Sequence, residues 1–224
     1  MKKINIAIDG PSAAGKSTIA KKVCELLNYV HLDTGAMYRC VGLKAKLNNI
    51  SYEDEEALCE MLKNTEIVLT PDGKIFMDGE DVSEEIRADD VSLAASDVSK
   101  HKNVRSDLVK RQQEMAKDKG FIMDGRDIGT VVLKDAELKI YLTASAESRA
   151  LRRYKQNIEL GLPVTDVETI AEEIRQRDYQ DMHRENSPLT KAEDAIELDT
   201  SDLTIEESVE AVMSYVEPLV QEDA

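Results

Sequence analysis

The sequence predicts an α/β fold in which a parallel sheet is covered by helices on both faces. Short apolar runs rich in β-branched residues alternate with helical stretches along the 224 residues, and right-handed crossovers between such units produce parallel strands. The first run leads into a glycine-rich turn and then an amphipathic helix, which is the order of a strand–loop–helix unit. The length suits one large domain, or one domain with a sizeable insertion.

Five runs are expected to form the sheet, and each is bounded by polar or turn residues. The first, 4–8, ends in Asp-Gly-Pro and precedes a helix over 17–27 whose apolar residues recur at helical spacing. The other strands are expected at 29–32, 121–124, 138–142 and 195–198. The other helices are expected at 36–47, 53–62, 89–117 and 167–184, and from about residues 146 and 205.

One segment departs from this alternation. The β-type runs 66–69 and 74–77 flank Thr70-Pro71-Asp72-Gly73, and a Pro-Asp-Gly turn favours an antiparallel hairpin. The sequence therefore predicts a small antiparallel element within a fold built mainly from strand–helix units.

The charge of the chain excludes two classes of partner. With 29 basic and 45 acidic residues the formal charge is −16, which opposes binding of nucleic-acid polymers and of anionic membranes. No apolar stretch is long enough for a membrane-spanning helix, and the N-terminal residues do not have the pattern of a signal peptide. Cys24, Cys40 and Cys59 are odd in number and widely spaced, as in a reducing compartment. We therefore expect a cytoplasmic protein.

The strongest motif is a phosphate-binding loop. Residues 10–17 match G-x-x-x-x-G-K-[ST], in which glycines allow backbone N–H groups to surround a phosphate at the start of a helix. Lys16 is expected to bridge the β- and γ-phosphates, and the Ser17 hydroxyl is expected to bind Mg²⁺. A glycine-rich turn without a ligand is the alternative. The predicted ATP-binding residues are Gly10, Pro11, Ser12, Ala13, Ala14, Gly15, Lys16, Ser17 and Thr18.

Two polar segments follow strand ends, where α/β proteins bind their ligands. The segment 33–39 begins with Asp33-Thr34 and ends in Arg39, and the segment 124–127 contains an Arg beside an Asp. Each can offer a cation to a second anion. Helix capping in the first segment and a surface Arg-Asp turn in the second are the less specific alternatives. Either Asp33 or Asp124 can hold Mg²⁺ through water, and the residues alone do not choose between them.

The expected helix over 167–184 changes character along one face. Its first positions on that face are apolar, whereas the later positions are Arg177, Asp181 and Arg184. This change indicates a helix that leaves the core and borders a polar cleft, although a solvated ion pair is the alternative.

A lid is predicted from a neighbouring group of arginines. Arg149, Arg152 and Arg153 directly precede the stretch 156–165, which contains Gly and Pro. Arginines beside such a loop indicate a segment that closes over a polyphosphate. An exposed basic helix face is the alternative.

These motifs resemble those of the bacterial cytidylate kinases over essentially the whole chain. The matching segments are GPSAAGKST at 10–18, LDTGAMYR at 32–39, VSEEIR at 82–87, DGRDIGT at 124–130 and RDYQDMHR at 177–184. The resemblance implies phosphoryl transfer from MgATP to CMP or dCMP, in line and without a covalent intermediate, in pyrimidine metabolism. It also implies a three-layer P-loop NTPase fold around a five-stranded parallel sheet. Within one domain, 1–224, it places a monophosphate-binding insertion at about 34–105 and a helical lid at about 150–168.

The same resemblance implies roles for individual residues. Those similar to the groups that bind the CMP phosphate are Arg39, Arg126 and Arg184. Those similar to the groups that read cytosine are Thr34, Arg105 and Asp127, and those similar to the pentose contacts are Ser96, Arg177 and Asp181. Catalysis is expected from Lys16, Arg126, Arg184 and the lid residue Arg153. One position departs from the family pattern, because Ala13 stands where a glycine is common, and we expect only a subtle effect on the loop.

Two other classes of function share some of these features. Another small-molecule kinase with a phosphate loop, acting on uridylate, shikimate or dephospho-coenzyme A, would need the same loop. A nucleotide-binding switch or assembly protein would bind ATP without a phosphate acceptor and could dispense with Arg126 and Arg184. For the kinase we expect a monomer with ATP and CMP or dCMP as partners, and Mg²⁺ as cofactor.

Overall fold

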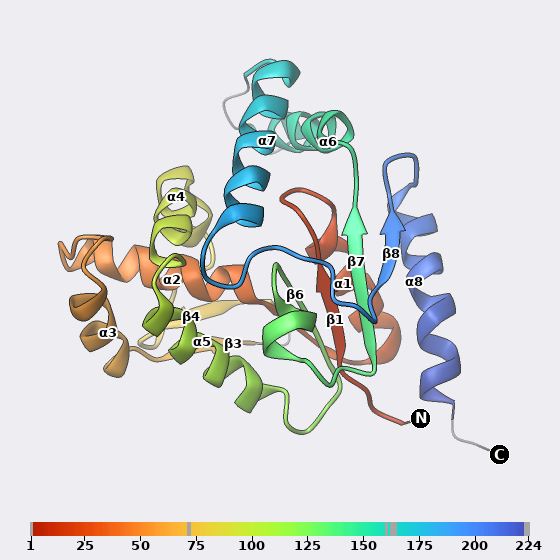
Figure 1. Ribbon diagram of the computed structural model, residues 1–224, viewed down its shortest axis with the longest axis horizontal. Helices are drawn as coiled ribbons and strands as arrows, with labels where there is room; N and C mark the ends of the chain where they lie inside the picture. Colours follow the sequence, from red (N-terminus) through yellow and green to blue (C-terminus); the bar gives the residue numbers. More distant parts are fainter. Residues whose placement is uncertain (1, 71–72, 160, 162–164, 222–224) are drawn as a thin grey trace. The chain divides into compact units, whose positions relative to one another are not determined.

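The computed structural model describes residues 2–70, 73–159, 161 and 165–221. Five strands form one sheet in the order β2-β6-β1-β7-β8, and the pairs β1–β6, β1–β7 and β7–β8 are parallel. Three further strands form a separate antiparallel sheet in the order β3-β4-β5. The expected α/β class, the five-stranded sheet with flanking helices and the small antiparallel element are therefore confirmed (Figure 1).

The chain divides into two compact units. Unit 1 comprises residues 1–29 and 119–224, and unit 2 comprises residues 30–118. The expected monophosphate-binding insertion at 34–105 lies within unit 2, and the expected lid at 150–168 lies within unit 1. Four residues of that lid segment, 160 and 162–164, are outside the described residues.

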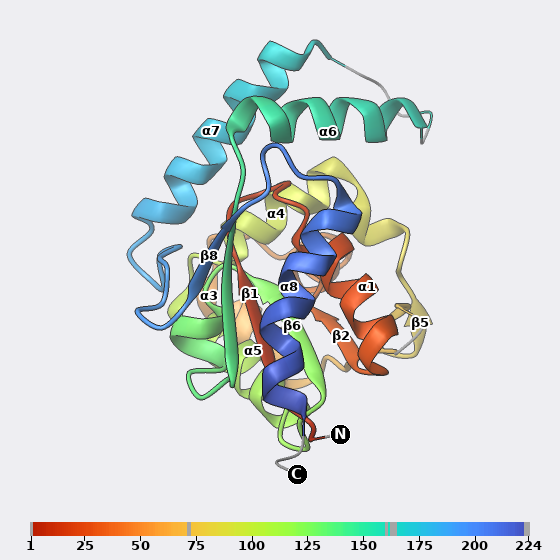
Figure 2. The same ribbon diagram turned by 90° about the vertical axis from the view of Figure 1, so that its right-hand side faces the viewer.

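Unit 1 carries the phosphate loop and most of the parallel sheet. In Figures 1 and 2, strands β1 and β7 run towards α6 and α7, which pack against each other beyond the carboxyl ends of these strands. The elements of this unit are β1 (Ile6–Asp9), α1 (Lys16–Leu27), β6 (Phe121–Gly125), η2 (Ile128–Val132), β7 (Leu138–Thr143), α6 (Ala146–Glu159), α7 (Val167–His183), β8 (Ile196–Asp199) and α8 (Ile205–Val220).

The apolar core of unit 1 lies on one face of its sheet. Ile6 and Ile8 of β1 point to this face with Ile140 of β7, because side chains two apart in a strand share a face. Helices α1 and α8 cover it through Val23, Val212 and other apolar residues. The opposite face carries the buried polar residues Asp9 and Lys139. Functional groups of β1 and β7 are therefore separated from the apolar core by the alternation of the strands.

Unit 2 consists mainly of helices around the small antiparallel sheet. Register pairs join Ile67 to Met77 and Phe76 to Asp81, so the expected hairpin gains a third strand. The expected turn residues Pro71 and Asp72 lie outside the described residues. The elements of unit 2 are β2 (Val30–Asp33), α2 (Thr34–Leu47), α3 (Glu55–Lys63), β3 (Ile67–Leu69), β4 (Ile75–Met77), β5 (Glu80–Asp81), η1 (Glu85–Arg87), α4 (Asp89–Val98) and α5 (Lys102–Met115).

The prediction of a single helix over 89–117 is wrong. The chain forms two helices, α4 and α5, and the backbone of His101 between them is extended, with φ −78° and ψ 125°. The Nε2 atom of His101 lies 2.7 Å from the Tyr52 carbonyl oxygen, and Arg105 donates to the Ser99 carbonyl at 3.2 Å. In a continuous helix the Ser99 carbonyl would accept from a backbone N–H, whereas here it accepts from the Arg105 side chain.

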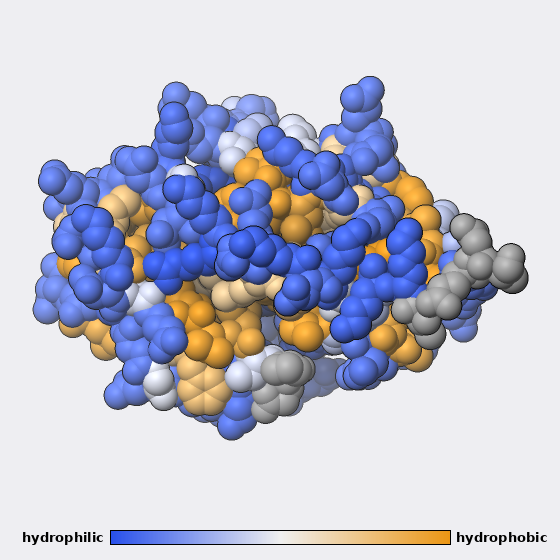
Figure 3. Space-filling view, turned by 90° about the horizontal axis from the view of Figure 1, so that it is seen from below, coloured by the Kyte–Doolittle hydropathy of each residue, from blue (hydrophilic) through white to orange (hydrophobic). Residues whose placement is uncertain are grey.

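Among the residues described, no helix is long and apolar enough to cross a membrane. On the face drawn in Figure 3, hydrophilic side chains form much of the surface, with apolar side chains between them.

Candidate active site

The phosphate loop connects β1 to α1, as the sequence predicts. Gly10 has φ 151°, and a Cβ atom on it would lie 2.1 Å from the Leu142 carbonyl oxygen, so no larger residue fits without backbone movement. Gly15 has φ 91° directly before the helix. Ala13 also has a left-handed backbone, with φ 59°. A glycine at position 13 would adopt this conformation without the steric cost that alanine carries.

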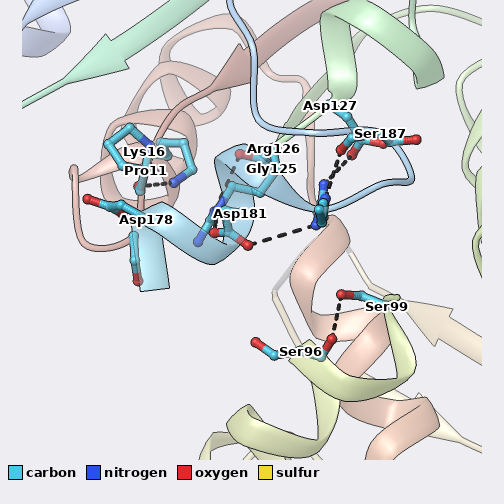
Figure 4. Close-up of polar contacts among 12 residues, drawn as sticks. Pro11, Lys16, Ser96, Ser99, Gly125, Arg126, Asp127, Asp178, Asp181 and Ser187 are labelled. Atoms are coloured by element: carbon cyan, nitrogen blue, oxygen red, sulfur yellow. Dashed lines mark hydrogen bonds and ion pairs between the residues drawn. The ribbon is translucent and has the colours of Figure 1, made fainter. Parts of the chain in front are cut away.

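Lys16 folds back over the loop. Its Nζ atom donates to the Pro11 carbonyl at 2.7 Å, as Figure 4 shows, and the residue is only 6% exposed. Burial, with Arg126 nearby, lowers the pKa of Lys16 to about 7, although Asp124 and Asp9 act in the opposite direction. A phosphate bound at the loop would place a further anion beside the Lys16 ammonium group, in addition to the carboxylates of Asp124 and Asp9.

Ser17 and Asp124 bring together the groups that a magnesium site needs. The Ser17 hydroxyl donates to the Asp124 carboxylate at 2.7 Å, and Asp124 is buried at the end of β6. The described residues contain no cluster of three or more His, Cys, Asp or Glu that could hold a metal. One hydroxyl and one carboxylate nevertheless fit Mg²⁺, because this ion keeps waters and phosphate oxygens as most of its ligands.

Asp33, the other candidate for the metal, has different partners. Its carboxylate caps α2 by accepting the Ala36 N–H at 3.1 Å, and it also accepts from Arg39 Nη2 at 2.7 Å. Its capping role and its orientation of Arg39 account for both oxygen atoms. Arg39 keeps a buried Nε atom that has no hydrogen-bond partner in the described part of the chain.

Four charged side chains of unit 1 form an alternating network. Arg126 Nε lies 2.7 Å from Asp181 Oδ2, and Arg184 lies 3.8 Å from Asp181 and 3.9 Å from Asp127 (Figure 4). Burial alone would lower the pKa of Arg126 and raise that of Asp181, but their mutual attraction shifts both in the opposite direction. The network therefore stabilises the charged form of Arg126 in a half-buried position.

Asp181 of this network lies on helix α7, as the change from apolar to charged residues along one face of the helix predicts. Ile170 and Ile174 are buried against α6, and Asp181 lies one to two turns further along the helix. Arg184 is the first residue after the helix, where its Nε atom donates to the Ser187 carbonyl at 2.8 Å. The expected continuation of the helix to Arg184 is therefore one residue too long.

The remaining predicted residues for CMP lie in unit 2. Thr34 is buried as the first residue of α2, and Ser96 lies on α4. The Arg105 guanidinium lies 5.4 Å from the centre of the Tyr38 ring, which is within range of a cation–π interaction. Unit 1 thus assembles Arg126, Asp127, Asp181 and Arg184, whereas unit 2 carries Thr34, Arg39, Ser96 and Arg105. Arg177 lies on α7.

Two of the three arginines expected near a lid have partners within unit 1. Arg149 is 5% exposed and donates to the Ser12 carbonyl at 3.0 Å, and its Nη2 atom lies 2.6 Å from Asp178. Arg152 donates to Thr200 Oγ1 at 3.2 Å. These contacts hold both side chains against other parts of unit 1, and the lid itself stays a prediction. Arg153 is half-buried on the same helix.

Three polar residues near the loop were missed by the sequence analysis. The buried Asp9 carboxylate accepts the N–H groups of Ile128 and Gly129, both at 2.7 Å. Asp178 and Thr200 are buried partners of the α6 arginines. Asp9 and Thr200 follow strand ends, which is a usable signal, but Asp178 has none because it looks like any helical acid in a charged chain.

The chain matches known proteins over nearly its full length. The family model described as Cytidylate kinase matches residues 6–218. A cytidylate kinase of Caldicellulosiruptor bescii is 54% identical over 226 residues, covering 100% of both chains. A cytidylate kinase of Bacillus subtilis is 52% identical over 219 residues, covering 96% of this chain and 97% of the relative.

Solved structures with a similar fold are more distant in sequence. A gluconokinase from Sinorhizobium meliloti 1021 has a TM-score of 0.51 at 12% identity, covering 97% of this chain and 94% of that chain. An uncharacterized protein from Eubacterium ventriosum has a TM-score of 0.53 at 12% identity, covering 97% of this chain and 99% of that chain. At this level of identity the likeness concerns the fold alone.

Proposed function

This chain belongs to the cytidylate kinase family, and we propose on that basis that it transfers the γ-phosphoryl group of ATP to CMP or dCMP. The products are ADP and CDP or dCDP. The observation that carries this proposal within the site is the pairing of a phosphate loop with a half-buried Arg126–Asp181–Arg184 network in the same unit. A phosphate-binding loop serves many kinases, whereas half-buried arginines in the same unit provide for a second, phosphate-bearing substrate.

ATP is bound by the phosphate loop in this proposal. Backbone N–H groups of the loop, which Pro11 lacks, surround the β-phosphate, and Lys16 moves from the Pro11 carbonyl to the β- and γ-phosphates. Mg²⁺, when bound, neutralises charge on these phosphates. The 2.7 Å contact between Ser17 and Asp124 supports Asp124 over Asp33 as the carboxylate that holds it.

The proposed contacts to CMP are those implied by the family motifs. Arg39, Arg126 and Arg184 bind its phosphate, and the buried Nε atom of Arg39 supports this role. Thr34, Arg105 and Asp127 read the base, since a carboxylate accepts from the exocyclic amine of cytosine and meets no donor on O4 of uracil. The pentose contacts are Ser96, Arg177 and Asp181.

The reaction itself needs positioning and charge neutralisation rather than a protein nucleophile. A CMP phosphate oxygen attacks the γ-phosphorus in line while the bond to the β-phosphate oxygen of ADP breaks. Lys16, Arg126, Arg184 and Arg153 stabilise the charge of the transferring group. A lid at about 150–168 excludes water, which would otherwise accept the phosphoryl group.

A panel of acceptors tests the activity. ADP formation from MgATP is measured with CMP, dCMP, UMP, AMP, shikimate and dephospho-coenzyme A. We expect CMP and dCMP to be the preferred acceptors. A preference for UMP over CMP of more than tenfold would replace this proposal with another small-molecule kinase, and ATP binding without turnover of any acceptor would favour a nucleotide-dependent switch.

Two substitutions test the residue roles. Arg184→Ala is expected to abolish turnover with CMP while ATP binding stays nearly unchanged, because its guanidinium is proposed to contact CMP and the transferring phosphoryl group but is not one of the predicted ATP-binding residues. Asp127→Asn is expected to relax the preference for CMP over UMP. An unchanged rate in the first variant would remove Arg184 from the site, and an unchanged preference in the second would remove Asp127 from base reading.

We also propose that the enzyme acts as a cytoplasmic monomer. Its proposed substrates are intracellular nucleotides, and Cys24, Cys40 and Cys59 are free thiols. Light scattering of the purified chain tests the monomer, and a mass near twice 25.0 kDa would contradict it.

A further inference from the structure

We infer that Arg149, held in place by Asp178, is a positioning residue that presets the phosphate loop for ATP from helix α6. The inference rests on the proposed function only in taking ATP as the ligand of the loop. Arg149 is set apart from the predicted ATP-binding residues, because its three guanidinium nitrogens contact protein groups, namely the Ala144 carbonyl, the Ser12 carbonyl and Asp178.

Three carbonyl groups of the loop accept hydrogen bonds from side chains. The Pro11 carbonyl accepts from Lys16 at 2.7 Å, and the Ser12 carbonyl accepts from Arg149 at 3.0 Å. The Ala14 carbonyl accepts from Thr200 Oγ1 at 3.4 Å. Because a trans peptide is planar, a carbonyl fixed in one direction turns the N–H of the next residue the opposite way. The bond from Arg149 to Ser12 therefore sets the direction of the Ala13 N–H, one of the groups expected to face a phosphate.

Several contacts hold the Arg149 side chain in place. Its Nε atom donates to the Ala144 carbonyl at 2.8 Å, and its Nη2 atom pairs with Asp178 of α7 at 2.6 Å. All three nitrogens of the guanidinium are thus engaged, and the side chain is 6% exposed. The planar guanidinium group of Arg149 therefore connects three parts of unit 1, which are the carboxyl end of β7, helix α7 and the phosphate loop.

The phosphate loop is strained at Ala13, next to the carbonyl that Arg149 binds. Ala13 has a left-handed backbone with φ 59°, which costs an alanine about 1 kcal/mol or more. Its methyl group packs against an apolar cluster formed by Ala150 of α6 and Ile170, Ala171 and Ile174 of α7. The same two helices that supply Arg149 and Asp178 therefore also hold the strained residue. Without the bond to the Ser12 carbonyl, this peptide can turn and withdraw its N–H from the phosphate.

The test replaces both charges of the pair so that none is left buried alone. In Arg149→Met with Asp178→Leu, side chains of similar volume keep the α6–α7 packing, and such exchanges of buried ion pairs are often neutral for stability. The matched control is Arg175→Met with Glu147→Leu. This pair also joins α7 to α6, at 2.6 Å, but it is exposed and has no contact with the loop among the described residues.

Binding of ATP with Mg²⁺ and binding of CMP are measured separately by calorimetry for the wild type and both double variants. We expect the Arg149/Asp178 variant to bind ATP at least tenfold more weakly than the control variant, with CMP affinity within twofold of wild type. A purely structural role would weaken both ligands or neither. ATP affinity equal to that of the control would overturn the inference.

A conservative variant covers the case in which the double variant does not fold. Arg149→Lys keeps a cation beside Asp178, but an ammonium group cannot also reach the Ser12 and Ala144 carbonyls as the guanidinium does. We expect a three- to tenfold loss of ATP affinity in this variant, and unchanged affinity would overturn the inference. If the wild type binds ATP but does not phosphorylate CMP, the proposed function fails while this ratio of ATP affinities still decides the role of Arg149.

Discussion

Arg126 and Asp181 form a half-buried ion pair, with 2.7 Å between Nε and Oδ2, and Arg184 lies 3.8 Å from the same carboxylate. Two guanidinium groups proposed to bind the CMP phosphate thus share one protein anion. Burying both without such an anion would be costly, because like charges repel strongly where water is scarce. Asp181 therefore has a second role besides its proposed contact with the pentose, which is to keep Arg126 in place before the substrate binds.

Removing this charge gives a direct prediction. Asp181→Asn leaves the arginines without their anion, so we expect the melting temperature to fall by about 5–10 °C. Inorganic phosphate is expected to restore more of this loss in the variant than it adds to the wild type, because the freed arginines bind it. Differential scanning calorimetry with and without phosphate measures both effects. Glu185→Gln, an exposed carboxylate in the same segment, is the control, and an equal loss in this variant would contradict the argument.

The metal ligand can be assigned by a second pair of substitutions. Asp124→Asn removes the carboxylate beside Ser17, and we expect the Mg²⁺ concentration for half-maximal activity to rise at least tenfold. Asp33→Asn is expected to weaken CMP binding through Arg39 while the Mg²⁺ dependence stays as in the wild type. Titration of activity with Mg²⁺ at saturating ATP separates the two outcomes. The reverse pattern would assign the metal to Asp33.

Sequence patterns predicted those parts of the site that depend on local order along the chain. The loop with Lys16 and Ser17, and the strand-end acid Asp124, follow from a motif and from strand boundaries. The charged half of α7 follows from helical spacing. The contacts of Asp9 and Arg149 were not predictable in this way, because each side chain binds backbone groups of segments more than 100 residues away. The break between α4 and α5 was missed for a related reason, since His101 at the break contacts the carbonyl of Tyr52, which lies 49 residues earlier in the chain.

Packing in unit 2 allows a test of how its helices support CMP binding. A Cβ atom on Gly42 of α2 would lie 2.9 Å from Ala94 Cβ of α4, so the two helices meet closely at this glycine. Gly42→Ala is expected to lower the free energy of unfolding by about 1–3 kcal/mol. Arg39 precedes Gly42 on α2, and Ser96 follows Ala94 on α4. We therefore expect the KM for CMP to rise while ATP affinity is retained.

A compensating change makes this prediction specific. Adding Ala94→Gly to Gly42→Ala removes the closest contact, so we expect part of the lost stability and part of the CMP affinity to return. The measurements are urea unfolding and steady-state kinetics. If Ala94→Gly only adds a further loss, the contact between these two residues is not the cause.

Asp9 predicts a pH dependence with a defined sign. Burial, with Asp127 nearby, raises the pKa of this carboxyl from 3.8 to about 6, although hydrogen bonds from Gly129 and Ile128 act in the opposite direction. An acid whose pKa is higher in the folded state favours folding most at low pH and loses that contribution as the pH rises through about 6. A difference of about 2 between the two pKa values corresponds to roughly 3 kcal/mol.

The comparison of wild type with Asp9→Asn isolates this contribution. Urea unfolding between pH 4 and 7 is expected to show the stability of the wild type falling relative to the variant by up to about 3 kcal/mol. Glu137→Gln is the control, because Glu137 also accepts a backbone N–H, from Asn5 at 2.9 Å. Burial raises the pKa of Glu137, but its hydrogen bonds and the charge of Lys119 together outweigh burial and lower it. For Glu137 the wild type should gain on the variant as the pH rises. Two results would contradict the argument that burial favours the protonated form of Asp9. One is a stability difference between wild type and Asp9→Asn that does not change with pH, and the other is a pH dependence of the same sign for Asp9→Asn and Glu137→Gln.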